Sequence, residues 1–118
     1  MLTFPKSARL SGDKLFGLVL AEGGRKAFTG GEIFWRENAL PYARFGFRVS
    51  SKVGKAHIRI TLRRRLRETV RKNQSLFKPG CDYLIIIRHP NLFPQMPEEK
   101  MPAYLFSLFG PEVLQRVS

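Results

Sequence analysis

The side chains with the clearest chemical capacity in this chain are its arginines and lysines. Its 118 residues include 21 Lys and Arg against nine Asp and Glu, which gives a net charge of +12. Eleven of the basic residues lie between residues 44 and 72, together with a single acid, Glu68. Guanidinium groups bind phosphate oxygens through paired, charge-assisted hydrogen bonds. This concentration of charge therefore predicts that residues 44–72 bind a polyanion, with nucleic acid as the favoured class.

Ten side chains are the predicted contacts with that polyanion: Arg44, Arg48, Lys52, Lys55, Arg59, Arg63, Arg64, Arg65, Arg67 and Arg71. A solvated basic surface without a specific partner is one alternative. An anionic membrane is another, but membrane helices insert an apolar face, and the apolar stripe here is needed for the core. Duplex DNA is a third, but a helix exposing almost only arginine has few groups for reading bases.

No group of residues has the composition and spacing of an active site. The two histidines, His57 and His89, and the one cysteine, Cys81, are too far apart in sequence for a typical zinc site. We interpret His57 as a surface residue, Cys81 as a partly buried thiol, and Glu68 as a partner of a neighbouring helical arginine. The sequence also has no glycine-rich phosphate loop. We therefore predict no catalytic residue and no metal ligand in this chain.

One strand, one loop and one long helix must position the basic residues. Residues 44–49 alternate, with Phe45, Phe47 and Val49 on one face, as in a half-buried strand. Residues 50–55 then form a loop.

Residues 56–73 contain no glycine or proline and are predicted to form the helix. Ile58, Leu62, Leu66 and Val70 recur every four residues and form its predicted buried stripe.

The remaining segments predict the other parts of an α/β sandwich, in which helices cover one mixed sheet. A short helix begins near residue 14 and ends at Gly23 and Gly24, strands cover residues 32–36 and 82–88, and a last helix covers 98–109. The order is helix, two or three strands, long helix, strand, helix, in a single domain of residues 1–118. Because no apolar run is long enough to cross a bilayer and no signal peptide is recognisable, we expect a cytoplasmic protein.

Six aromatic residues have two possible roles: Phe16, Phe34, Trp35, Phe45, Phe47 and Tyr83. Each can pack in the core, and each can provide a surface on which an unpaired base stacks. The sequence pattern alone leaves both roles open, with core packing favoured for any single ring.

Residues 44–68 resemble the protein subunit of bacterial ribonuclease P. The family pattern is Arg-x-Gly-x-x-Val-Ser-Lys-Lys-x-Gly, then Ala, Arg-Asn-Arg-x-Lys-Arg and Arg-Glu. The matching residues are Arg44, Gly46, Val49, Ser50, Lys52, Gly54, Ala56, Arg59, Arg64, Arg67 and Glu68, with Arg63 in place of the lysine. Residues 4–10, 16–23 and 79–88 resemble the family's start, first helix and fourth strand, with Leu20 where an aromatic residue is usual.

The resemblance implies a fold and a function. The implied fold is a single mixed four-stranded sheet with three helices and a left-handed crossover, the ribosomal protein S5 domain 2-like class. The basic helix and the preceding loop would bind the catalytic RNA, and a groove with Phe16, Leu20, Phe34 and Phe47 would bind the 5′ leader of precursor tRNA. Endonucleolytic removal of the leader would be carried out by the RNA and its Mg²⁺. No membrane and no obligate protein partner are expected.

Two residues depart from the family pattern. Ile60 and Thr61 follow Arg59, where the family has Asn-Arg, and Ile60 is predicted to project away from the buried stripe. Losing one charge-assisted hydrogen bond costs about 1.5–3 kcal/mol, which Arg64 and Arg65 would offset in part. The alternative function is that of a non-catalytic structural RNA-binding protein of the ribosomal type.

Overall fold

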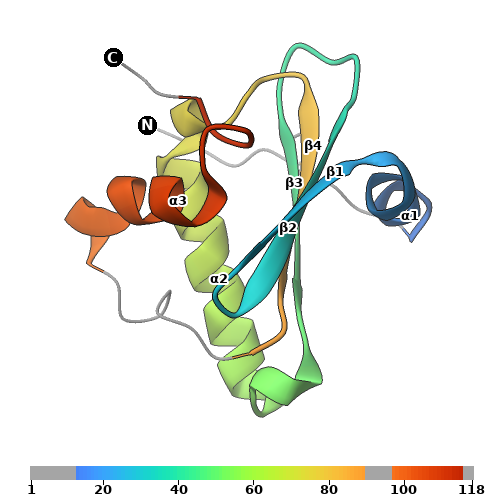
Figure 1. Cartoon of the computed structure of the whole chain (residues 1–118). Helices are drawn as coiled ribbons and strands as arrows, with labels where there is room; N and C mark the ends of the chain where they lie inside the picture. Colours follow the sequence, from blue (N-terminus) through green and yellow to red (C-terminus); the bar gives the residue numbers. More distant parts are fainter. Residues whose placement is uncertain (1–12, 90–96, 116–118) are drawn as a thin grey trace.

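The computed structural model describes residues 13–89 and 97–115. One four-stranded sheet carries α1 on one face and α2 and α3 on the other (Figure 1). The elements are α1 Asp13–Glu22, β1 Gly24–Phe28, β2 Gly31–Glu37, β3 Arg44–Val49, α2 Ala56–Lys72, β4 Cys81–Ile87 and α3 Met101–Phe109, with 3₁₀ turns η2 Ser51–Val53, η3 Gln74–Leu76 and η4 Glu98–Lys100. This confirms the predicted single mixed sheet with three helices.

The sheet has the strand order β1-β2-β4-β3. β1 and β2, and β2 and β4, pair antiparallel, whereas β3 and β4 are parallel and are joined through α2. All seven residues of β4 are buried, as expected of a continuous apolar run in the centre of a sheet. The crossover places α2 on the face of the sheet opposite α1.

Strand β1 was not predicted from the sequence. The segment Gly-Arg-Lys-Ala-Phe has little apolar alternation, because β1 is an edge strand whose residues alternate between half-buried and exposed. A turn at Thr29 and Gly30 returns the chain into β2, and Gly30 has the positive φ of 91° that favours glycine.

Alternating side chains divide the core into two layers. The larger layer lies between the sheet and helices α2 and α3, and Phe45, Phe77 and Tyr83 form part of it with ring centroids 5.0–5.5 Å apart. The smaller layer lies under α1 and contains Val19, Phe34, Leu84 and Ile86, with Leu15 and Phe16 packed against it. Trp35, Phe45 and Tyr83 therefore have the core role, on the α2 side.

The buried stripe of α2 begins later than predicted. Leu62, Leu66 and Val70 are at most 2% exposed, whereas Ile58 is 43% exposed. The prediction for Ile58 was wrong, because the first turn of α2 packs against the preceding loop at Gly54 rather than beneath the sheet. Ile60 is 61% exposed, which confirms that it projects away from the stripe.

The last helix follows the predicted segment, with η4 as its first turn. Met101, Leu105 and Phe109 are spaced by four residues and are all buried against the larger core layer. No helix within residues 13–89 and 97–115 combines the length and the apolar content needed to cross a membrane.

Candidate nucleic-acid interface

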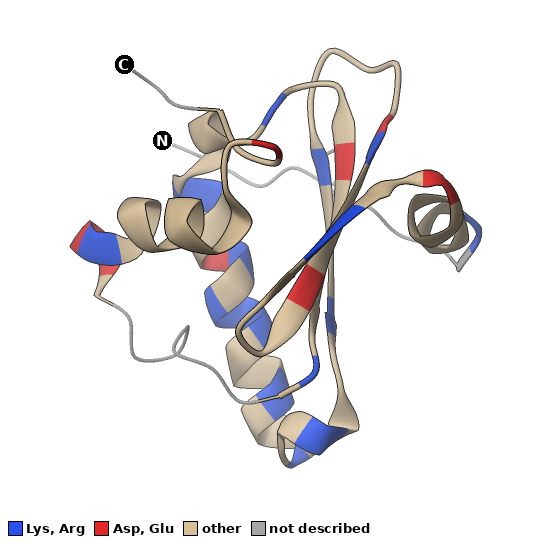
Figure 2. Ribbon diagram, viewed as in Figure 1, with Lys and Arg blue, Asp and Glu red and all other residues tan. Residues whose placement is uncertain are grey.

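Helix α2 presents a continuous basic surface. Lysines and arginines follow α2 and the turn before it along most of their length (Figure 2). The first turn of α2 contains no acid, and its N-cap residue, Lys55, makes no side-chain capping bond. The unpaired amides and positive end of a helix dipole attract anions, so this helix start favours a bound phosphate. We call Arg59, Arg63, Arg64 and Arg67 the basic helix face.

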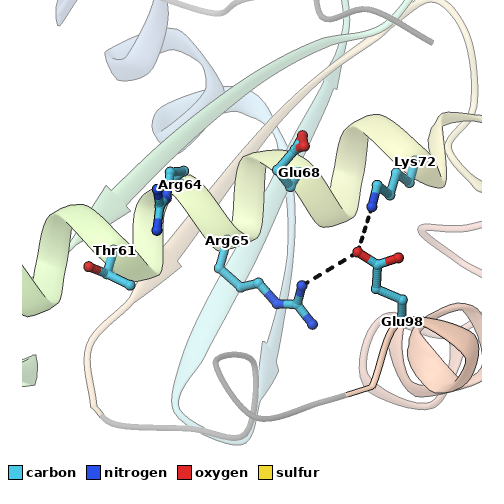
Figure 3. A pocket seen from close by; sticks show the side chains of 6 residues that line it. All are labelled: Thr61, Arg64, Arg65, Glu68, Lys72 and Glu98. Carbon is cyan, nitrogen blue, oxygen red and sulfur yellow. Dashed lines mark hydrogen bonds and ion pairs between the residues drawn. The ribbon is translucent and has the colours of Figure 1, made fainter. Parts of the chain in front are cut away.

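The second half of α2 is partly neutralised by acids. Arg71 donates from Nε to Glu68 Oε2 at 2.8 Å, and the hydrogen bond lowers the pKa of Glu68. Lys72 Nζ lies 2.5 Å and Arg65 Nη1 lies 3.8 Å from Glu98 Oε1 (Figure 3). The predicted helical partner of Glu68 is therefore Arg71.

The basic helix face is less neutralised by acids than the second half of α2. Arg64 and Arg67 form no ion pair with the acids of the described ranges. Arg59 donates from Nε to the carbonyl oxygen of Gly54 at 3.2 Å, which fixes the loop at the helix start. The Nε of Arg63 is buried without a hydrogen-bond partner. This half of α2 is therefore the part best able to accept phosphates.

A hollow of about 480 Å³ adjoins the basic helix face at the edge of the sheet. We call it the groove, and its lining residues are Leu20, Phe47, Arg48, Val49, Ser50, Arg63, Ile86 and Arg88. Arg48 lies with its guanidinium carbon 4.5 Å from the centroid of the Phe16 ring. The groove thus combines apolar side chains from α1 and β4 with arginines from β3, α2 and the end of β4.

The loop between β3 and α2 connects the two surfaces. Ser50 Oγ accepts a hydrogen bond from the backbone N–H of Lys52 at 3.2 Å, which caps η2. Lys52 and Lys55 are both exposed. The predicted basic loop therefore continues the basic surface from the groove to the start of α2.

The predicted groove residues are not equivalent. Leu20 is 38% exposed and Phe16 is half-buried beside Arg48. Phe34 is only 7% exposed, and the Arg25 guanidinium lies 6.0 Å from its ring centroid. Phe47 lines the groove but also packs against the α2-side core layer, on the opposite face from Phe16. Leu20 and Phe47 therefore line the groove, Phe16 lies beside it against Arg48, and Phe34 is buried.

Arg44, one of the predicted phosphate contacts, has a structural partner. Its Nε and Nη2 donate to the two carboxylate oxygens of Asp82, each at 2.7 Å, and Asn38 Nδ2 donates to the same carboxylate at 2.8 Å. Asp82 is fully buried. The hydrogen bonds that Arg44 donates to Asp82 raise the pKa of Arg44, consistent with a fixed ion pair. An acid inside an apolar strand was the signal that a buried cation had to neutralise it.

Sequence reasoning missed a second arginine–carboxylate cluster. Glu32, on β2, is 8% exposed and accepts hydrogen bonds from Nε of Arg25 and, at 2.7 Å, from Nε of Arg88. Burial alone would raise the pKa of Glu32, but the bonds from Arg88 and Arg25 outweigh it and lower that pKa. The available signal was again an acid inside a strand, here directly before the apolar residues Ile33, Phe34 and Trp35.

The acids near these surfaces do not fit a metal site. Glu32, Glu68 and Glu98 are each bound by arginine or lysine. Across the described part of the chain, His, Cys, Asp and Glu residues form no group of three or more able to hold a metal ion. His57 is exposed, as predicted, and Cys81 is buried, which raises the pKa of its thiol.

Comparison with known proteins agrees with this geometry. A family model described as ribonuclease P matches residues 4–107. The ribonuclease P protein component of Legionella pneumophila is 39% identical over 90 residues, covering 75% of each chain, and that of Fusobacterium nucleatum is 41% identical over 56 residues, covering 48% of this chain and half of that protein. The solved ribonuclease P protein of Thermotoga maritima is 29% identical, covering 84% of this chain and 92% of that one, with a TM-score of 0.71. The chain therefore belongs to the ribonuclease P protein family.

Proposed function

We propose that this chain is the protein subunit of a ribonuclease P that binds the catalytic RNA through the basic helix face and the 5′ leader of precursor tRNA through the groove. The observation that carries the proposal is the position of Arg63. It belongs to both surfaces, and its buried Nε has no partner. A phosphate held by the outer amino groups of Arg63 would lie where the two RNAs meet.

The basic helix face suits a folded RNA. Its arginines are aligned along one rigid helix, and phosphate contacts of this kind position an RNA without reading its sequence. Each phosphate that they neutralise releases condensed counterions, so affinity is expected to fall steeply with salt. The exposed Ile60 lies among these arginines, where the family pattern has a polar residue.

The groove suits a single strand. Unpaired bases stack on apolar and aromatic side chains while arginines follow the backbone. Leu20 and Phe47, with Phe16 beside Arg48, offer the first kind of contact, and Arg48, Arg63 and Arg88 offer the second. A leader strand can therefore be bound without base-specific hydrogen bonds.

The protein contributes binding, and we assign the chemistry to the RNA partner. The carboxylates beside both surfaces are held by arginine or lysine, so Mg²⁺ would be bound mainly by the RNA. Neutralising phosphates where catalytic RNA and precursor meet would lower the concentration of Mg²⁺ needed for cleavage. The product would be the mature 5′ end of tRNA, made in the cytoplasm.

Reconstitution with a bacterial ribonuclease P RNA tests this function. We expect the protein to increase cleavage of precursor tRNA strongly at low Mg²⁺ and to have little effect at high Mg²⁺. Binding to ribosomal RNA with no increase in cleavage would contradict the proposal and would favour a structural RNA-binding role.

A further inference from the structure

The α1-side face of the sheet carries two arginines that are held by one buried acid. Glu32 has a side chain that is 10% exposed, whereas the side chains of Arg25 and Arg88 are 63% and 50% exposed. Arg25 donates from Nε to Oε2 of Glu32, and Arg88 donates from Nε to Oε1. Each carboxylate oxygen therefore holds one guanidinium.

This arrangement leaves the outer ends of both guanidiniums available. Each arginine bonds Glu32 through Nε, and its two terminal amino groups have no further hydrogen-bond partner in the described part of the chain. Because at least half of each side chain is exposed, these amino groups can be reached by a ligand. Two exposed cations and one buried anion give the cluster a net charge of +1. A phosphate is the ligand that matches paired guanidiniums of this kind.

The cluster continues the groove across the sheet. Arg88 lines the groove, and its backbone N–H donates to the carbonyl oxygen of Gly30 at 2.8 Å. Glu32 is paired with Ile86, which is paired in turn with Arg48 on β3. Arg25 lies beyond Glu32, on the edge strand β1. The basic residues thus extend from the β3 edge of the sheet to the β1 edge.

Both arginines are restrained before any ligand binds. The Arg25 guanidinium lies 6.0 Å from the centroid of the Phe34 ring, which adds a second restraint to its bond with Glu32. Fixing a long side chain in advance reduces the conformational entropy lost on binding. Glu32 is therefore placed to orient the two cations rather than simply to cancel their charge.

We propose that Arg25 and Arg88, oriented by Glu32, form a clamp for a backbone phosphate of single-stranded RNA, which extends the groove to β1. This inference rests on the proposed function, because it adds a phosphate site to the path assigned to the leader. Arg25 and Arg88 are the ligand-binding residues, and Glu32 is a positioning residue.

The clamp is tested by binding of the full chain to a labelled oligouridylate of roughly ten nucleotides, followed by fluorescence anisotropy from about 50 to 200 mM salt. We expect R25Q to weaken binding roughly threefold to tenfold and to reduce the slope of log affinity against log salt by about 0.7, the value for one phosphate on a single strand. The matched control is R36Q, because Arg36 is also an arginine of the sheet paired with an acid, Glu22, at 3.1 Å. Equal effects of R25Q and R36Q would overturn the clamp.

A pair of acid variants separates orientation from charge. E32Q and E22Q each remove one negative charge, so charge alone predicts that both strengthen RNA binding. If Glu32 orients the arginines, E32Q weakens binding roughly twofold to fivefold while E22Q does not. Stronger binding by a folded E32Q would contradict the positioning role. Thermal unfolding checks folding, and if E32Q is unfolded, R25K replaces it, since lysine keeps the charge but loses the bond from Nε.

The same assay distinguishes this inference from the proposed function. If the unmodified chain shows no salt-dependent binding to the oligouridylate, or if R48Q and R63Q leave binding unchanged, the leader path itself is wrong. If those two variants weaken binding while R25Q behaves like R36Q, only the extension of the groove to β1 is wrong.

Discussion

The arginines of α2 and those of the sheet differ in what holds them. On the sheet, Arg44 is paired with the buried Asp82, and Arg25 and Arg88 with the buried Glu32. On the basic helix face, Arg64 and Arg67 form no ion pair with an acid of the described ranges. Arg44 therefore serves the fold, Arg25 and Arg88 are restrained by a buried acid but keep exposed side chains, and Arg64 and Arg67 are not restrained by any acid of the described ranges.

This difference shows that a buried acid gives a nearby arginine a structural role. A buried carboxylate without a cation is costly, so Asp82 requires Arg44 whatever else binds to the protein. An exposed arginine on a helix with few acids is instead repelled by its basic neighbours. Binding of a polyanion removes this repulsion.

The largest effect is expected from Arg44→Ala. The substitution leaves Asp82 buried without its cation, which costs about 3–5 kcal/mol of unfolding free energy. Urea unfolding followed by circular dichroism measures this. Arg48→Ala, a change on the same strand at an exposed position, is the control and is expected to cost much less. A loss of less than about 1 kcal/mol for Arg44→Ala would mean that the ion pair is not structural.

The second effect concerns RNA affinity rather than stability. Arg64→Ala and Arg67→Ala each remove a charge-assisted contact worth about 1.5–3 kcal/mol, so each is expected to weaken binding to ribonuclease P RNA by about tenfold or more. Their slopes of log affinity against log salt should become shallower by up to about 0.9. Filter binding at several salt concentrations gives both quantities. Unchanged slopes would remove the basic helix face from the interface.

A third effect should depend on the substrate. Phe16→Ala removes the ring beside Arg48, and we expect it to weaken binding of precursor tRNA by the holoenzyme about fivefold while mature tRNA is unaffected. Because Phe16 also packs on the smaller core layer, thermal unfolding must accompany the binding measurement. Equal weakening for both tRNAs would identify Phe16 as a core residue only.

A fourth effect depends on pH. The pKa of Glu32 is lowered from its ordinary value of 4.5, so its ion pairs stabilise the folded state above that pH. This contribution is lost as the pH falls below 4.5 through the pKa of the folded state. Glu32→Gln, which has no such titration, is expected to lose less stability over that range in urea unfolding at a series of pH values. A parallel loss in both proteins would contradict this assignment.

The smallest effect is expected where acids already neutralise α2. Glu98→Gln releases Lys72 and Arg65 and should strengthen RNA binding by about twofold, since exposed ion pairs are weak. The control is Glu99→Gln, because Glu99 forms no ion pair within the described residues. If the two variants bind equally, only the change in net charge matters, and this flank of α2 lies outside the interface.

Local periodicity predicted most of the fold. Three segments were predicted correctly because each has one buried face or is wholly buried. They are the alternating residues 44–49, the helix with the stripe Leu62, Leu66 and Val70, and the apolar run that forms β4. β1 was not located, because an edge strand buries too little to need an apolar pattern.

The site was predicted less completely than the fold. Charge counting predicted a basic surface on α2, but it did not predict that Arg44 pairs with Asp82 or that Arg25 and Arg88 pair with Glu32. Those roles depend on Asp82, 38 residues away from Arg44, and on Glu32, 56 residues away from Arg88. Pairings at such separations arise from strand order, which no local pattern in the sequence contains.

The most direct test of the account is the rate of precursor-tRNA cleavage by the reconstituted holoenzyme at low Mg²⁺. The measurement compares the unmodified protein with a double variant, Arg64→Ala with Arg67→Ala, at protein concentrations below saturation. We expect strong stimulation by the unmodified protein, and a loss of stimulation in the folded double variant that a higher protein concentration restores. Equal stimulation by both proteins would contradict the claim that the unpaired arginines of α2 bind the catalytic RNA.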